Sequence, residues 1–143
     1  MSTEATQTFR PGLPPFSEEQ VITFPDGLPG FESARRFIIL STPEHVPFHW
    51  MEAVEGPRLR FALINPLKFR PDYQPRIKKV DLDSLLIQDP KDLLFYVIVT
   101  VKQPMQESTA NLMGPVFINI RERIGKQVII ENDDYGPRER LMP

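Results

Sequence analysis

Residues 93–102 read Leu-Leu-Phe-Tyr-Val-Ile-Val-Thr-Val-Lys and give the strongest strand signal in the chain. β-Branched and aromatic side chains are enriched in strands because they pack well on a pleated surface. The apolar run from Leu93 to Val101 is interrupted only by Thr100, and it is far shorter than the ~20 residues of a membrane-spanning helix. We therefore expect a central strand in a mainly β protein, and no membrane segment.

Shorter strand signals precede this run and are separated by turns. They lie at residues 20–24, 36–41, 48–51 and 59–65. The turn Pro25-Asp-Gly-Leu-Pro-Gly30 carries two glycines and two prolines, which favour a compact reversal of the chain. Within residues 59–65, apolar residues alternate with Arg60, which predicts a half-buried strand. Strands at this spacing are typical of an antiparallel sheet or barrel.

Proline adds a second constraint. The chain has 16 prolines in 143 residues, about twice the usual ~5%, and prolines spread in this way exclude a protein built from long helices. Pro11, Pro14 and Pro15 predict a flexible or extended N-terminal arm over residues 1–19. Residues 20–141 are predicted to form one small antiparallel β-barrel-like domain with one or two short helices.

Two elements of that domain are predicted in more detail. Residues 81–88 are the best helix candidate, with Asp81 as the cap and three leucines on one side. Residues 116–120 and 127–131 are predicted to pair as a hairpin around Gly125.

The composition excludes several classes of function. The absence of cysteine excludes disulfide frameworks, thiolate zinc sites and a cysteine nucleophile. A net charge of −2 argues against sequence-independent binding of nucleic acid. The N-terminal residues lack the basic start and apolar run of a targeting segment, so a cytoplasmic protein is expected.

No arrangement of residues indicates catalysis. The paired acids, such as Asp81 and Asp83, lie outside apolar runs and are interpreted as caps, turns and solvated faces. His45 and His49 point the same way on an extended chain but lack an evident third ligand, so a metal site is not expected. There is no nucleophile elbow and no glycine-rich phosphate loop. We expect a binding protein without enzymatic activity, cofactor or metal.

One stretch, residues 58–76, suggests an alternative function. It interleaves arginines with aromatic residues, as a surface that stacks bases and contacts phosphates would. The competing interpretation is that the aromatic side chains lie in the core and the arginines are solvated. A small β-barrel that binds single-stranded RNA is therefore kept as the alternative hypothesis.

Five segments, taken in order, resemble the flagellar assembly factor family FliW. They are Phe24-Pro-Asp-Gly-Leu-Pro-Gly-Phe-Glu32, Pro47-Phe48, Asn65-Pro66 with Phe69 and Asp72-Tyr73, the block from Thr109 to Asn119, and Gly125 to Arg138 with Gln127 and Tyr135. Each segment is a weak signal, but their order over residues 20–141 makes the resemblance strong. Departures include the proline-rich residues 9–16 in place of a first strand, and Glu52-Ala53 where Gln-Ser is common.

The resemblance implies a small β-barrel-like protein in the bacterial cytoplasm. Members of the family bind flagellin before its export, and they bind and antagonise the translational regulator CsrA. Accumulated flagellin occupies the family member and releases CsrA, which then represses flagellin translation. For this chain the resemblance implies flagellin and CsrA as partners, with a monomer expected and no direct contact with nucleic acid.

The partner-binding residues are predicted from the same segments. Phe69, Asp72 and Tyr73 lie between prolines that hold the chain in an irregular or extended form, which would suit a contact. A packing role remains open beside the contact role for Phe69, which could plug the barrel end, and for Tyr135 and Arg138. For Asn111 the alternative is a hydrogen bond within its own loop. The six predicted partner-binding residues are Phe69, Asp72, Tyr73, Asn111, Tyr135 and Arg138.

Overall fold

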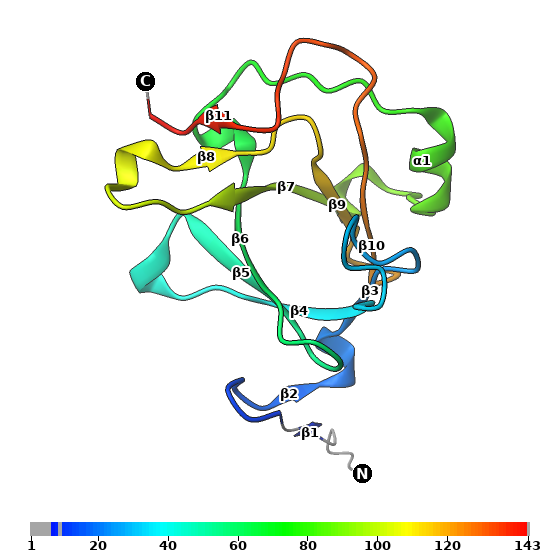
Figure 1. Ribbon diagram of the computed structural model, residues 1–143. Coiled ribbons are helices and arrows are strands. Elements are labelled where there is room, and N and C mark those ends of the chain that lie inside the picture. The colour runs from blue at the N-terminus through cyan, green and yellow to red at the C-terminus, as the bar shows by residue number, and fades with distance from the viewer. Residues whose placement is uncertain (1–6, 9, 143) are drawn as a thin grey trace.

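Seven strands form a closed barrel (Figure 1) in a computed structural model that describes residues 7–8 and 10–142. Their bounds are β3 (Ile22–Thr23), β4 (Arg36–Leu40), β5 (Phe48–Ala53), β6 (Arg60–Ile64), β7 (Leu93–Thr100), β9 (Val116–Asn119) and β10 (Ile124–Gln127). Around the barrel the order is β7-β6-β5-β4-β3-β10-β9, and β9 pairs back onto β7. The pairs are antiparallel except for β3 and β10, which are parallel. The predicted mainly β barrel is therefore confirmed.

Strand β7 is the central strand, as its sequence predicts. Its first half pairs with β9 and its second half with β6. The end of β7 also carries a small outer sheet, in which β8 (Thr109–Ala110) pairs with β7 and β11 (Glu139–Arg140) pairs with β8. The outer sheet extends from the barrel beside its upper rim (Figure 1). Strand β11 is the last strand of this sheet and has β8 as its one neighbour among the described residues, which makes it an edge strand.

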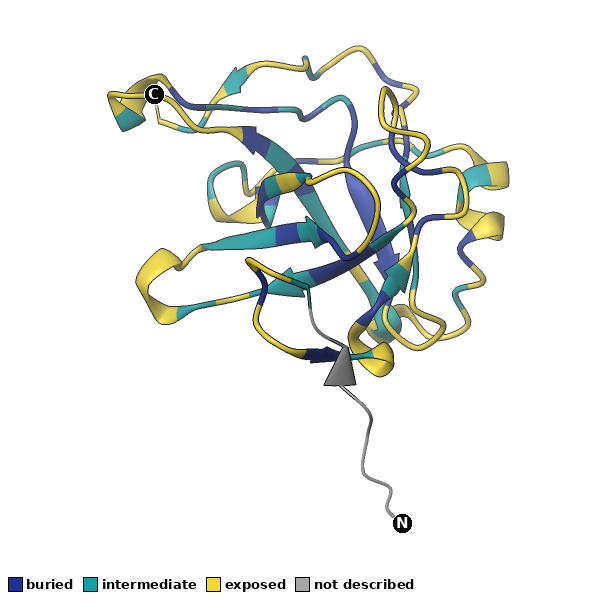
Figure 2. Cartoon of the chain, turned by 60° about the horizontal axis from the view of Figure 1, so that its bottom comes forward, coloured by how far each residue is buried: buried dark blue, intermediate teal, exposed yellow. Residues whose placement is uncertain are grey.

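Two apolar clusters cover opposite faces of the strands β6 and β7. The inner cluster fills the barrel and includes Leu63, Met51 and Phe24, whose ring meets that of Phe37 edge to face at 5.2 Å. The outer cluster contains Ala62, Ile64, Val97 and Val99. Figure 2 shows these buried stretches along the strands, with exposed residues in the loops. Strand β6 is thus buried on both faces near its end, and the predicted half-buried alternation holds only at Arg60.

Prolines begin three of the short 3-10 turns that connect the strands. These turns are η1 (Glu18–Gln20), η2 (Pro43–His45), η3 (Pro66–Lys68), η4 (Pro90–Asp92) and η5 (Met105–Glu107). Proline suits the first position of such a turn because its fixed φ is already helical and its missing N–H would have no partner there. Three of the sixteen prolines therefore lie at the starts of turns between strands.

The single α-helix of the described residues differs from the prediction. Helix α1 spans Lys79–Ser84, and its N-cap is Lys78 rather than Asp81. Asp81 lies in the first turn, where its carboxylate forms a 2.8 Å ion pair with Lys126 of β10. Of the three leucines expected on one buried side, only Leu85 is fully buried. No helix among the described residues is long and apolar enough to cross a bilayer.

The predicted hairpin is also shifted. Its second strand is β10, Ile124–Gln127, rather than residues 127–131. Gly125 lies inside this strand, opposite Ile118, instead of in the turn. A Cβ atom at position 125 would stand 2.5 Å from the ring of Phe24, so the glycine is required by close packing rather than by turn geometry.

The N-terminal segment, predicted as a flexible or extended arm over residues 1–19, packs on the barrel from residue 10 onward. Strand β1 (Gln7–Thr8) pairs with β2 (Phe16–Ser17), and Leu13 and Phe16 are buried in a cluster with Ile38 of β4. The driving force is apolar burial, which the polar and proline-rich appearance of the segment conceals.

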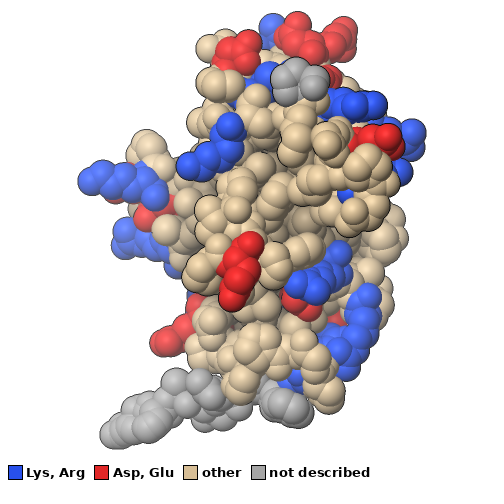
Figure 3. All heavy atoms as spheres, turned by 90° about the vertical axis from the view of Figure 1, so that its left-hand side faces the viewer, with Lys and Arg blue, Asp and Glu red and all other residues tan. Residues whose placement is uncertain are grey.

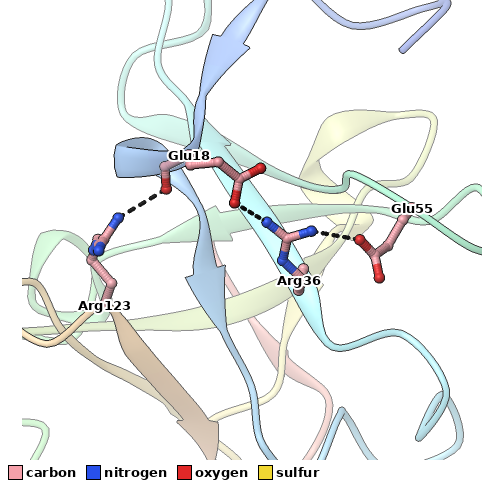
Figure 4. Close-up of polar contacts among 4 residues, drawn as sticks. All are labelled: Glu18, Arg36, Glu55 and Arg123. Atoms are coloured by element: carbon pink, nitrogen blue, oxygen red, sulfur yellow. Dashed lines mark hydrogen bonds and ion pairs between the residues drawn. The ribbon is translucent and has the colours of Figure 1, made fainter. Parts of the chain in front are cut away.

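Ion pairs hold the same segment from outside (Figure 4). Arg36 of β4 contacts Glu18 and, at 2.6 Å, Glu55. Arg123 donates a 2.8 Å hydrogen bond to the carbonyl of Glu18. Segments far apart in the sequence therefore meet at Glu18, close to the start of β3.

Candidate partner-binding surface

Four of the six predicted residues meet on the outer side of the barrel. Phe69, Tyr73 and Tyr135 pack against the outer cluster on β6 and β7, and Asp72 lies between the first two on the chain. The segment that carries Phe69 and Tyr73 begins with turn η3, which Asn65 caps by accepting a hydrogen bond from the N–H of Leu67. Proline and this cap fix the local path of the chain, as expected.

Tyr73 and Tyr135 join the segment to the C-terminal region. Their rings meet edge to face with centroids 4.7 Å apart. The hydroxyl of Tyr73 donates a 2.7 Å hydrogen bond to the buried carbonyl of Leu112, and the hydroxyl of Tyr135 accepts one of 3.0 Å from the N–H of Gln74. Burial, followed by the proximity of Tyr135, raises the pKa of Tyr73, so its hydroxyl stays protonated and donates at neutral pH. These contacts give both tyrosines a packing role.

An ion pair closes the outer cluster at β11. Arg70 donates a 2.9 Å hydrogen bond to the carboxylate of Glu139, which also accepts one of 2.8 Å from the N–H of Gly136. These two hydrogen bonds lower the pKa of Glu139, the one from Arg70 contributing most. Both side chains are about one-third exposed or less, so the pair is more protected from solvent than most of the ion pairs in the chain.

Asn111 holds its own loop. Its side-chain oxygen accepts hydrogen bonds from the N–H groups of Met113 and Gly114, at 3.1 and 3.0 Å. The sequence left this packing role open beside a contact with a partner. The loop places the carbonyl of Leu112 against Tyr73, so Asn111 supports the outer cluster although it does not belong to it.

Asp72 and Arg138 are the predicted residues with the most exposed side chains. Asp72 contributes its backbone carbonyl to Tyr135 at 3.4 Å, while its side chain is exposed. Arg138 lies apart from the aromatic residues and lines a hollow on the outer sheet. The structure therefore brings together Phe69, Asp72, Tyr73 and Tyr135, with Asn111 nearby, and separates Arg138. Contact of any of the six with a partner stays a prediction.

The hollow beside Arg138 is a feature that the sequence did not suggest. It has a volume of about 510 Å³ and lies over the ends of β7, β8 and β11. Its lining residues are Thr100, Lys102, Glu107, Thr109, Arg138 and Arg140; we call it the basic hollow. The sequence does show these side chains spaced by two residues near the ends of three strands. That spacing indicates a common surface only once the three strands are known to be neighbours.

The arginines of residues 58–76 do not form one surface with the aromatic residues. Phe61 packs on the inner cluster, whereas Phe69 and Tyr73 pack on the outer one. The guanidinium of Arg60 lies over the ring of Trp50, 3.9 Å from its centre, and forms an ion pair with Glu52. Because these groups already have partners within the protein, their arrangement does not favour the alternative RNA-binding function.

The two histidines have separate partners. His45 contacts Thr42 through Nδ1, and His49 contacts Ser41 and meets the ring of Tyr96 edge to face at 5.2 Å. Burial lowers the pKa of His49, which keeps it neutral at neutral pH. Among the described residues no group of three potential ligands is placed to hold a metal ion.

The FliW protein family matches residues 5–141. The chain belongs to the FliW family.

Several relatives are named as flagellar assembly factor FliW. The protein of Alkaliphilus metalliredigens is 39% identical over 127 residues, which cover 88% of this chain and 78% of the relative. The protein of Syntrophomonas wolfei is 40% identical over 126 residues, 88% of this chain and 81% of the relative. A crystal structure of the flagellar assembly factor FliW superposes with a TM-score of 0.85 at 34% identity, covering 96% of this chain and 98% of the other. The predicted FliW resemblance and the barrel fold are therefore confirmed.

Proposed function

We propose that this FliW-family chain binds flagellin as a chaperone-like assembly factor and, when flagellin is absent, binds and antagonises CsrA. The observation that carries the proposal is family membership over residues 5–141, with relatives named as flagellar assembly factors. The flagellin and CsrA partners follow from the FliW resemblance of the sequence segments. Such a switch acts without enzymatic chemistry and belongs in the cytoplasm, where flagellin is made before its export.

The physical requirement for this switch is modest. Two ligands that bind with negative coupling regulate each other through the protein, and no bond needs to be made or broken. Several charged groups of the described part of the barrel have partners within the protein, such as Arg70 with Glu139. The protein is proposed to act as a monomer, with one of each site.

Calorimetry with purified cognate proteins tests the proposal. We expect each of flagellin and CsrA to bind separately with about micromolar affinity or tighter, which corresponds to ~8 kcal/mol. We also expect flagellin to release CsrA from a preformed complex. Absence of a binding signal with both proteins would contradict the proposal, and simultaneous binding without any change in affinity would contradict the switch.

Asp72 provides a test of the predicted partner-binding residues. CsrA binds RNA and is expected to present basic surface, so the exposed carboxylate of Asp72 would attract it. The variant Asp72→Lys should weaken CsrA binding about tenfold or more through like-charge repulsion. Asp26→Lys, which changes the charge equally at another exposed position, is the matched control. Equal effects of both variants would assign the loss to net charge and remove Asp72 from the contact.

A further inference from the structure

The basic hollow lies on one face of a three-stranded sheet. Thr100 pairs with Thr109, and Thr109 pairs with Arg140, so these three side chains form a row across β7, β8 and β11. Directly paired residues project to the same face, and so do residues two positions along each strand. Lys102 and Glu107 lie just beyond this row on one side, facing each other in the continued β7–β8 register, whereas Arg138 precedes β11 by one residue and lies on the other side of the row. The row ends at the edge strand β11.

Cations without partners gather in this hollow. Lys102, Arg138 and Arg140 form no ion pair among the described residues, and Glu107 is the only acid in the lining. Elsewhere arginines such as Arg36 and Arg70 are paired with acids. The hollow therefore carries a local excess of two positive charges on a chain whose net charge is −2. Figure 3 shows basic side chains, with acidic ones among them, in the upper part of this face.

The outer edge of β11 is open among the described residues. In the sheet order β11 has a neighbour on one side only, which is β8. The N–H of Leu141 donates to the carbonyl of Ser108 on the β8 side. Because successive residues of an antiparallel strand direct their backbone groups to opposite edges, the N–H and C=O of Arg140 face away from β8. An unpaired edge of this kind can accept another strand.

We propose that the edge of β11 and the basic hollow bind an extended acidic segment of a protein partner, which adds to the outer sheet as a further strand. Two carboxylates at alternate positions of that segment would stand beside Arg140 and Arg138, and the one beside Arg140 would extend the row of Thr100 and Thr109. Main-chain hydrogen bonds to β11 supply affinity, and the arginines select acidic side chains.

The geometry favours an acidic protein segment over RNA. The hollow offers no aromatic side chain on which a base could stack, and stacking is the usual basis of binding to single strands. Arg140 in β11 and Arg138 just before it are spaced by two residues, which matches the side-chain period of an added strand. The proposal does not depend on flagellin or CsrA, because it concerns the chemistry of the segment and not the protein that carries it.

Fluorescence anisotropy with a labelled peptide tests the proposal on the full chain. The probe is a nine-residue peptide in which glutamate alternates with valine and threonine. The first control peptide has the same composition with its glutamates adjacent, and the second has glutamine in place of glutamate. We expect the alternating peptide to bind with an affinity that falls as salt is added. Both control peptides should have an affinity at least about tenfold lower. Equal binding of the three peptides would overturn the proposal.

Variants of the protein locate the site. The double variant Arg138→Glu and Arg140→Glu should lose at least about tenfold in affinity for the alternating peptide. Lys91→Glu and Arg121→Glu, both at exposed positions outside the hollow, make the matched control and should bind as the unmodified protein does. Unchanged binding by the Arg138 and Arg140 variant would overturn the proposal.

A variant and a peptide with exchanged charges distinguish a lost contact from a loss of peptide binding caused by misfolding. A peptide that alternates lysine with valine and threonine should bind the Arg138→Glu and Arg140→Glu variant better than it binds the unmodified protein. A locally unfolded edge would bind neither peptide, and that result would count against β11 as the docking strand.

Tighter binding of single-stranded oligouridine than of the acidic peptide at this site would overturn the assignment to a protein partner. Peptide binding without flagellin or CsrA binding would leave this inference standing while the proposed function fails.

Discussion

At the scale of single residues, Tyr73 connects two distant parts of the chain through one hydroxyl group. Its hydrogen bond to the carbonyl of Leu112 is 2.7 Å long, and Leu112 is fully buried. Tyr73→Phe would leave that carbonyl without its donor, so we expect a loss of about 1–2 kcal/mol in the free energy of unfolding. Urea denaturation measures it. Tyr96→Phe is the control, since the Tyr96 hydroxyl has no hydrogen-bond partner among the described residues, and a comparable loss there would contradict the explanation.

Also at the scale of single residues, we expect Glu139 to make the stability of the fold depend on pH. Hydrogen bonds from Arg70 and Gly136 lower its pKa below the ordinary 4.5. A carboxylate with a lowered pKa stabilises the fold above the ordinary value, and this contribution disappears as the pH falls through the folded-state pKa. Glu139→Gln should therefore cost about 1 kcal/mol at pH 7. Denaturation midpoints measured from pH 7 down to pH 3 should converge for the two proteins, whereas exposed Glu131→Gln should follow the unmodified protein throughout.

At the scale of elements, β10 depends on the absence of a side chain. A Cβ at Gly125 would approach the ring of Phe24 to 2.5 Å, while one at Gly136 would meet its nearest neighbour at 3.5 Å. We expect Gly125→Ala to cost about 1–3 kcal/mol through overpacking and Gly136→Ala to cost much less. Thermal unfolding followed by circular dichroism compares them, and equal shifts would remove the steric explanation.

The second residue after helix α1, Leu86, has an unfavourable backbone conformation. Leu86 has a φ of 59° and an exposed side chain, and the amide of Asn119 holds the carbonyls of Leu85 and Leu86. Glycine is the usual residue at such a helix end because it lacks the Cβ that causes the strain. We expect Leu86→Gly to raise the free energy of unfolding by about 0.5–1 kcal/mol. A loss of stability would show that the leucine side chain contributes more than its exposure indicates.

Elements with local signals were predictable, and those defined by distant pairing were not. The strands around residues 36–41 and 93–102 carry long apolar runs, and the one around residues 48–51 carries three large apolar side chains beside His49. The two-residue strand β3 and its parallel pairing with β10 depend on how the barrel closes, which no local pattern records. The predicted helix cap was wrong for the same reason, because Asp81 forms an ion pair with Lys126 of β10, 45 positions away.

The sequence predicted which residues belong to the candidate site better than it predicted what each residue does there. Phe69, Tyr73 and Tyr135 were chosen from separate segments, and the structure brings them to one cluster. Whether an aromatic residue packs or makes a contact depends on which face of β6 and β7 lies beneath it, and that follows from the closure of the barrel. The basic hollow was missed because Lys102, Glu107 and Arg138 become neighbours only through strand pairing.

At the scale of the whole molecule, the N-terminal segment and the barrel should unfold together. Phe16 is buried against Ile38 of β4, and the next residue toward the N-terminus, Phe37, lies in the barrel interior. Phe16→Ala should therefore cost about 3–5 kcal/mol. The loss should appear equally in circular dichroism and in the fluorescence of Trp50, the only tryptophan, which lies on β5 outside the Phe16 cluster. Phe31→Ala, at a 42% exposed side chain, should cost clearly less. If the Trp50 transition stays in place while circular dichroism shows an earlier partial loss, the segment is a separate unit attached to an independently stable barrel.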